Sequence, residues 1–181
     1  MLILTIPATE LFDNKKQMFI NIPETTLHLE HSLVSVSKWE SKWRKPFMSA
    51  STKKTYTETI DYIKCMTITQ NVNPNVYNGL TDKNIQDVND YISNPMTATT
   101  FSNEPKGAKK EIITSELIYY WMVSLNIPME CQKWHLNRLL TLIRVCNIKN
   151  APGKKMSRRE TASRYAALNA ARRKKLNTKG W

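Results

Sequence analysis

The sequence predicts a helix-dominated α+β fold: small N-terminal β-strands, a bundle of about five helices and a basic C-terminal helical tail. The first basis is Thr114–Asn150, which holds most of the apolar mass and has the pattern of two helical segments. They meet at Asn126-Ile127-Pro128, because proline lacks an amide hydrogen and disfavours α geometry in the residue before it. The second segment is apolar around most of its circumference, so we expect it to lie inside the body.

The second basis is a set of short β-prone runs near the N-terminus. They predict strands at Met1–Ile6, Met18–Ile22 and Thr26–Leu29, separated by Pro7 and Pro23. Apolar and polar residues alternate in the third run, which indicates one buried face.

Capping residues and apolar spacing predict three helices before the central pair. These are Ser32–Trp43, stopped by Pro46, then Thr55–Met66, then a helix from the cap Thr81 to Ser93. The first is ambiguous, since Val34 and Val36 fit a strand period, but Leu33, Val36, Trp39 and Trp43 share one helix face. We therefore favour a helix there.

A loop and a possible hairpin are predicted in the segments that connect these helices. The Thr55–Met66 helix has Tyr56, Ile60, Ile63 and Met66 roughly aligned, and a loop with Asn73-Pro74-Asn75 follows it. Nearer the central pair, Thr97–Ser102 and Glu111–Thr114 could form a hairpin over a charged loop.

The charge distribution supplies the third basis and the predicted division of the chain. The net charge is +12, but residues 151–181 hold ten Lys and Arg and a single acid, Glu160, for a net +9. The first 150 residues hold the remaining 17 basic and 14 acidic residues and are nearly neutral. We predict a globular α+β body over 1–150 and a basic tail, helical or disordered, over 151–181. Within the tail, Ser157-Arg158-Arg159-Glu160 has the pattern of a capping box that opens a helix reaching Leu176.

Three cysteines, Cys65, Cys131 and Cys146, lie in apolar helical contexts, which is typical of reduced, buried thiols in a cytosolic protein. The start of the chain lacks a basic leader, so we expect no signal peptide. No stretch approaches the roughly 20 apolar residues that span a bilayer. These features predict a soluble, intracellular protein that does not use a membrane.

The sequence contains few of the residues that a catalytic or metal-binding motif requires. Cys131 and His135 stand four apart, a spacing that can chelate a metal, but a structural zinc site needs about four ligands. His135 and Arg138 match the short H-x-x-R element of tyrosine recombinases, without the arginine context that accompanies it. The four glycines are isolated, and no paired-carboxylate motif stands out. We predict no catalytic residues, no metal and no cofactor, and hence a protein that is not an enzyme.

The basic tail supplies the candidate partner-binding residues, and Tyr165 is included because it could stack on a base. These residues are Arg158, Arg159, Arg164, Tyr165, Arg172, Arg173, Lys174 and Lys175. Cationic segments of this kind bind nucleic acid through counterion release, complement acidic or mixed-charge protein segments, or serve only solubility. The residues alone leave these three alternatives open.

Several stretches resemble one family. They are L-E-H-S-L-V-S-V-S-K-W-E-S-K-W at Leu29–Trp43, D-Y-I-K-C-M-T at Asp61–Thr67 and K-W-H-L-N-R-L-L-T-L-I-R-V-C-N-I-K-N at Lys133–Asn150, followed by the basic tail. Together they resemble small proteins of long-tailed bacteriophages that are labelled tail assembly chaperones. The resemblance spans most of the chain.

The resemblance implies a protein that coats the long, helical tape measure protein and keeps it soluble in the host cytoplasm until tube subunits polymerise. Such a role needs exposed grooves that accept amphipathic helices, and mobile charged extensions. A second copy of the chain, forming an oligomer, is a further candidate partner. Trp and Met residues such as Trp121 and Met129 would suit helix-binding pockets, although core packing is the favoured explanation for most of them. The alternatives are a nucleic-acid-binding phage protein that uses the basic tail, and a minor structural protein of the tail.

Overall fold

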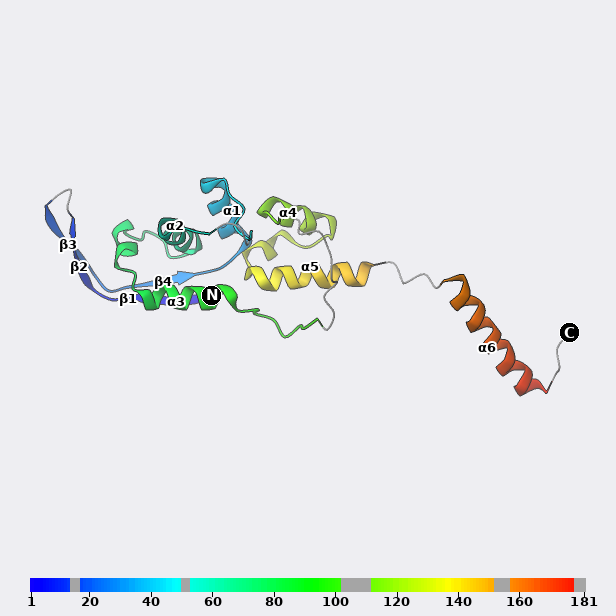
Figure 1. Cartoon of the computed structure of the whole chain (residues 1–181). Helices are drawn as coiled ribbons and strands as arrows, with labels where there is room; N and C mark the ends of the chain where they lie inside the picture. The colour runs from blue at the N-terminus through cyan, green and yellow to red at the C-terminus, as the bar shows by residue number, and fades with distance from the viewer. Residues whose placement is uncertain (14–16, 50–52, 102–111, 152–156, 178–181) are drawn as a thin grey trace. The chain divides into compact units, whose positions relative to one another are not determined.

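The structure, a computed structural model, describes residues 1–13, 17–49, 53–101, 112–151 and 157–177. The strands are β1 Leu2–Ile6, β2 Thr9–Asp13, β3 Met18–Ile22 and β4 Thr25–Leu29. The helices are α1 Leu33–Trp43, α2 Tyr56–Met66, α3 Asp82–Ser93, α4 Ser115–Ser124, α5 Leu136–Asn150 and α6 Arg158–Leu176, with 3-10 helices η1 Pro74–Gly79 and η2 Met129–Lys133 (Figure 1). The predicted helix-dominated α+β class is confirmed. The chain divides into two compact units, Met1–Asn147 and Ile148–Trp181.

The four strands form two antiparallel two-stranded sheets, β1–β4 and β2–β3, which follow one another along a single ribbon. In β1–β4, Leu2 faces Leu29, and in β2–β3, Asp13 faces Met18; the numbers of each facing pair sum to 31 throughout. The same register would place Pro7 opposite Glu24 and Pro23 opposite Ala8. Proline cannot donate to a strand ladder, so the two prolines interrupt the pairing without changing its register.

The base of the ribbon, β1–β4, is held on both edges. On one edge the His28 carbonyl accepts from the Ile68 amide at 2.8 Å, and Leu29 forms a bridge with Thr67. On the other edge the Asn84 amide group donates to the Thr5 carbonyl at 3.1 Å, which fixes α3 beside β1. The base thereby presents its apolar side chains to the helices.

Side-chain caps fix the helix starts at the predicted places. Ser32 accepts from the Ser35 amide ahead of α1, and Thr55 and Thr81 open α2 and α3 with reciprocal capping boxes. Helix α1 ends earlier than Pro46 alone would require, because Arg44 adopts a left-handed conformation with φ 53°. Each of the N-terminal side-chain caps, Ser32, Thr55 and Thr81, stabilises its helix by about 1 kcal/mol.

The core lies between the ribbon base and the inner faces of the helices. It contains Leu27 and Leu29 from β4, Trp39 from α1 and Met122 from α4, all fully buried. The Trp39 indole donates to the Glu58 carbonyl at 2.9 Å, so burial costs it no hydrogen bond.

Helix α5 differs from the prediction that it lies inside the body. Only Leu136, Leu139 and Ile143 are buried, while Leu140 and Cys146 are half-buried. The buried residues repeat at three and four positions, so α5 packs through a single stripe. The prediction was wrong because the apolar residues outside that stripe are only partly covered.

Other expectations also need correction. A strand at Thr9–Asp13 was not predicted, and the loop after α2 contains η1. Tyr56, expected on the inner face of α2, is exposed, because it lies in the first turn. The expected hairpin of Thr97–Ser102 with Glu111–Thr114 lies partly outside the described residues, and residues 97–101 and 112–114 form no strand.

Candidate partner-binding surface

Helix α6 contains all eight residues predicted to bind a partner, and its ends are defined by local chemistry. Ser157 accepts from the Glu160 amide at 3.1 Å, and the Glu160 carboxylate accepts from the Ser157 amide at 2.8 Å. These hydrogen bonds lower the pKa of Glu160. At the other end, Asn177 adopts a left-handed conformation with φ 51°, and Arg173, Lys174 and Lys175 lie in the last turn, where cations favour the helix dipole.

No residue of α6 is buried. Tyr165 and Leu176 are 63% and 69% exposed, and Leu168 is 44% exposed. Apart from the half-buried Thr161, the side chains of α6, charged and apolar alike, are exposed.

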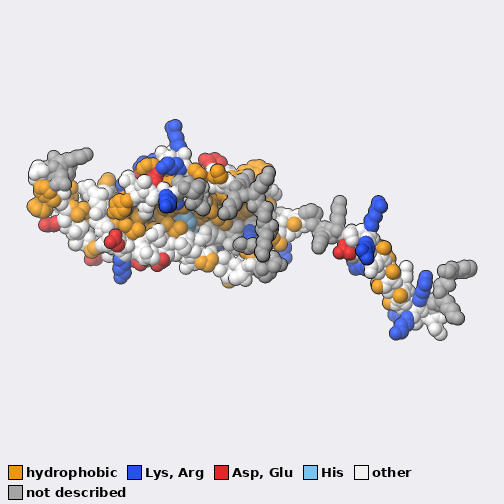
Figure 2. All heavy atoms as spheres, viewed as in Figure 1, with side chains coloured by type: hydrophobic (Ala, Val, Ile, Leu, Met, Phe, Trp, Pro, Cys, Tyr) orange, Lys and Arg blue, Asp and Glu red, His pale blue; other side chains and the backbone are white. Residues whose placement is uncertain are grey.

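The basic residues surround α6. At about 100° per residue, no arc wider than roughly 80° lacks a Lys or Arg between Arg158 and Lys175. The expected apolar stripe of Ala162, Tyr165, Leu168 and Leu176 spans about 120°, but Arg158 and Arg172 fall within the same arc. Lys and Arg side chains accordingly lie on more than one side of the helix (Figure 2). The stripe is therefore interrupted, and α6 is not an amphipathic helix with one apolar face.

The residues of the metal-chelating pair and of the H-x-x-R element make contacts within the body. Cys131 is buried in η2 and His135 precedes α5, so the pair does not lie on one α-helix as predicted. The Arg138 guanidinium stacks on the Trp134 ring, 4.3 Å from its centroid. His135 Nε2 lies 3.1 Å from the Tyr91 carbonyl, which can only accept, so this nitrogen carries the hydrogen and donates.

Two buried histidines lie side by side in the body, a pairing that the sequence does not reveal. The rings of His31 and His135 have centroids 5.1 Å apart, and His31 Nδ1 lies 2.5 Å from the Tyr62 hydroxyl. Burial, followed by the charges of His135 and Lys54, lowers the pKa of His31 to about 3. Burial also lowers the pKa of His135, against the opposing effect of its bond to the Tyr91 carbonyl. Both rings are neutral at pH 7.

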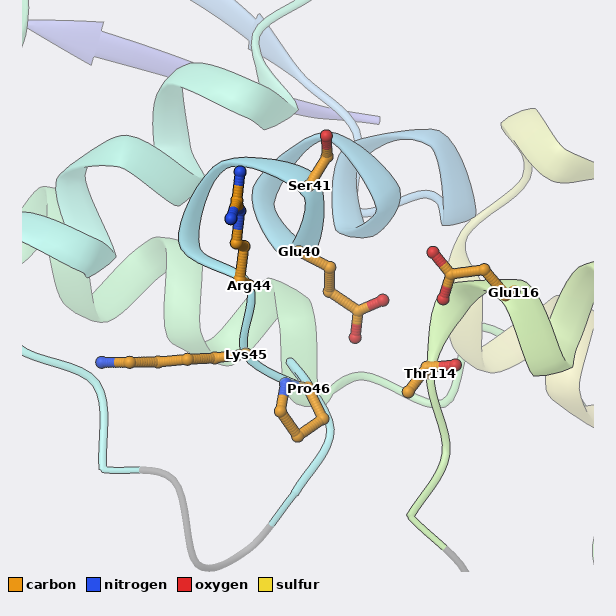
Figure 3. A pocket seen from close by; sticks show the side chains of 7 residues that line it. All are labelled: Glu40, Ser41, Arg44, Lys45, Pro46, Thr114 and Glu116. Atoms are coloured by element: carbon orange, nitrogen blue, oxygen red, sulfur yellow. The ribbon is translucent and has the colours of Figure 1, made fainter.

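A pocket of about 270 Å³ lies between the end of α1 and the start of α4. The buried Glu40 carboxylate points toward Pro46 and Thr114, while the side chains of Arg44 and Lys45 point away from it (Figure 3). Both Glu40 oxygens already accept backbone hydrogen bonds at 2.7 Å, from Phe47 and Ser115. The carboxylate thus joins three segments of the body.

Neither a metal-ligand cluster nor a membrane-spanning helix occurs in the part of the chain that the structure describes. These residues contain no group of three or more His, Cys, Asp and Glu placed to hold a metal ion. Among the same ranges, no helix is long and apolar enough to cross a membrane. Comparisons with protein-family models, curated proteins and solved structures find no match for the chain.

Proposed function

We propose that this protein is a non-enzymatic tail assembly chaperone of a long-tailed bacteriophage, which binds the tape measure protein in the host cytoplasm and keeps it soluble. The resemblance of Leu29–Trp43, Asp61–Thr67 and Lys133–Asn150 to that family supports the choice of partner. The observation that carries the binding surface is α6, a capped helix with no buried residue. Its seven Lys and Arg against one Glu would complement acidic segments of a long helical protein.

Co-expression with the tape measure protein of the same phage tests the proposal. We expect the two chains to co-purify and the soluble fraction of the tape measure protein to rise. A variant with Arg172, Arg173, Lys174 and Lys175 all changed to Gln should lose the complex, because the C-terminal end of α6 then loses four charges.

A matched control removes the same number of charges from the body. Lys38, Lys53, Lys83 and Lys133 are exposed there, and changing all four to Gln gives the same net charge as the α6 variant. This control should co-purify as the wild type does. If the wild-type pair shows no co-purification and no gain in solubility, the chaperone function is excluded.

The distribution of charge around α6 favours nucleic-acid binding as the second candidate, since a polyanion can contact a helix from several sides. A salt titration with a DNA or RNA fragment tests it. The logarithm of the affinity should fall linearly with the logarithm of salt concentration, and the quadruple Gln variant of α6 should lower that slope by up to about 3.6, or about 0.9 per lost phosphate contact. An unchanged slope would exclude α6 as the nucleic-acid contact.

A further inference from the structure

The two halves of the β-ribbon differ in what covers them. The base, β1–β4, is hydrogen-bonded on one edge to residues 67–69 and on the other to Asn84. The near end of the distal half, β2–β3, packs against η1, where Ile22 is buried, and only its far end extends past the helices of the body (Figure 1). Among the described residues, no backbone hydrogen bond joins β2 or β3 to any segment other than each other.

The distal half also exposes large apolar side chains. Phe12 and Phe19 face each other across the strands with ring centroids 5.1 Å apart, and they are 46% and 68% exposed. Met18, which precedes Phe19 and therefore lies on the opposite face of the ribbon, is 52% exposed. A two-stranded ribbon is marginally stable in water, whereas three or more strands with an apolar face are stable. Packing against a helix also stabilises such a ribbon, but beyond η1 the distal half has, among the described residues, no third strand.

The two outer edges of this half are not equivalent. β3, with the sequence M-F-I-N-I, contains no charge and no proline. β2 contains the exposed Glu10 and ends at Asp13, and charged residues on an edge oppose pairing with another strand. The edge of β3 is accordingly the one suited to accept a strand.

We propose that the free edge of β3 pairs, antiparallel, with the same edge of a second copy of this chain, so that Phe19 lies opposite Phe19 of the other copy. The product is a four-stranded sheet with the strand order β2-β3-β3-β2. Its two aromatic pairs form one row of rings on a single face, and aromatic cross-strand pairs stabilise sheets. Because the strands run antiparallel, the two bodies extend from opposite ends of the sheet, and the acidic β2 strands form its outer edges and stop further growth.

Charge does not oppose a second copy at the paired edge. Residues 9–22 contain two acidic and two basic residues and are neutral, so the paired segments do not repel each other. The remainder of each copy carries the whole +12. Salt screens that repulsion, so dimerisation should strengthen as ionic strength rises, opposite to the salt dependence of nucleic-acid binding. The contact surface is small, which predicts weak and concentration-dependent dimers.

Analytical ultracentrifugation of the full chain over a hundredfold range of concentration tests the proposal. The wild type should follow a monomer–dimer equilibrium. The variants Phe19→Glu and Phe19→Lys should each dimerise at least about tenfold more weakly, because like charges then face each other. An equimolar mixture of the two variants should recover dimers to within about threefold of the wild-type constant, since Glu then faces Lys.

Rescue in the mixture separates loss of contact from loss of folding, because an unfolded ribbon would not regain pairing. As a matched control, Tyr56 on α2 is 65% exposed, and the same two substitutions there should leave the equilibrium unchanged. Three results would overturn the proposal: a wild type that stays monomeric throughout, Phe19 variants that dimerise like the wild type or are not rescued by mixing, or open-ended assemblies in place of a dimer. The proposal does not depend on the chaperone function.

Discussion

Replacing Glu40 with Gln tests how α4 is held to the rest of the body. Thr114 stands at the N-cap of α4 without a side-chain cap bond, and the Glu40 carboxylate of α1 accepts from the Ser115 amide instead. Its other oxygen accepts from the Phe47 amide, so one buried side chain connects α1, α4 and the segment after α1. Gln offers a single acceptor oxygen, and its amino group would face a backbone N–H that also donates.

The magnitude follows from that mismatch. A hydrogen bond to a charged group contributes about 1.5–3 kcal/mol, and a buried amide left without a partner costs about 1–3 kcal/mol. We therefore expect Glu40→Gln to lower the free energy of unfolding by about 3 kcal/mol, a large share of the roughly 5–15 kcal/mol of a typical domain. Glu116→Gln is the control, since Glu116 lies exposed in the first turn of the same helix and its loss should cost less than about 1 kcal/mol.

Urea unfolding followed by tryptophan fluorescence measures both variants, because the chain has five Trp and Trp39 is fully buried in α1. With a slope of about 2 kcal/mol per molar urea, the midpoint of Glu40→Gln should fall by about 1.5 M. A midpoint within about 0.3 M of the wild type, or equal to that of Glu116→Gln, would refute the assigned role.

Three further outcomes are expected. His31 is neutral in the folded state and protonates near pH 6.5 in the unfolded state, so the unfolded state binds more protons. The free energy of unfolding should therefore fall by about 2 kcal/mol as the pH drops from 6.5 to 5. Urea titrations at each pH measure this fall, and His31→Gln should make the dependence of stability on pH less steep. A Cβ at Gly79 would lie 3.2 Å from the Thr9 side chain and 3.3 Å from the Ile6 side chain. Gly79→Ala should therefore destabilise the fold by about 1–3 kcal/mol through overpacking and lower the melting temperature. An unchanged melting temperature would show that the strands shift to accommodate the added methyl group. Ser157→Ala removes the cap of α6 and should reduce the circular-dichroism helix signal of a peptide covering residues 151–181, whereas Ser163→Ala, a substitution inside the same helix, should not.

Local chemistry made several elements predictable. Ser32, Thr55, Thr81 and Ser157 mark four helix starts, because a side-chain oxygen that satisfies a first-turn amide acts over only three residues. The concentration of charge in the last 31 residues is likewise a property of the sequence alone. That concentration is sufficient to single out the candidate partner-binding residues of α6.

Long-range pairing could not be read in the same way. The strand Thr9–Asp13 has little alternation of its own and forms because Met18–Ile22 returns beside it in register. The apolar residues of α5 gave no sign of which stripe would be buried, since that depends on which elements lie beside the helix.

The sequence by itself determined where the helices begin, which part of the chain is cationic and that helices predominate. Only the tertiary structure decided that Glu40 caps α4 from another helix and that His31 meets His135. It also decided that the edges of β1–β4 are hydrogen-bonded to other segments while, among the described residues, no other segment hydrogen-bonds to the outer edge of β3. The reason is physical: caps and net charge depend on neighbours in sequence, whereas burial, shared hydrogen bonds and open edges depend on segments that only folding brings together.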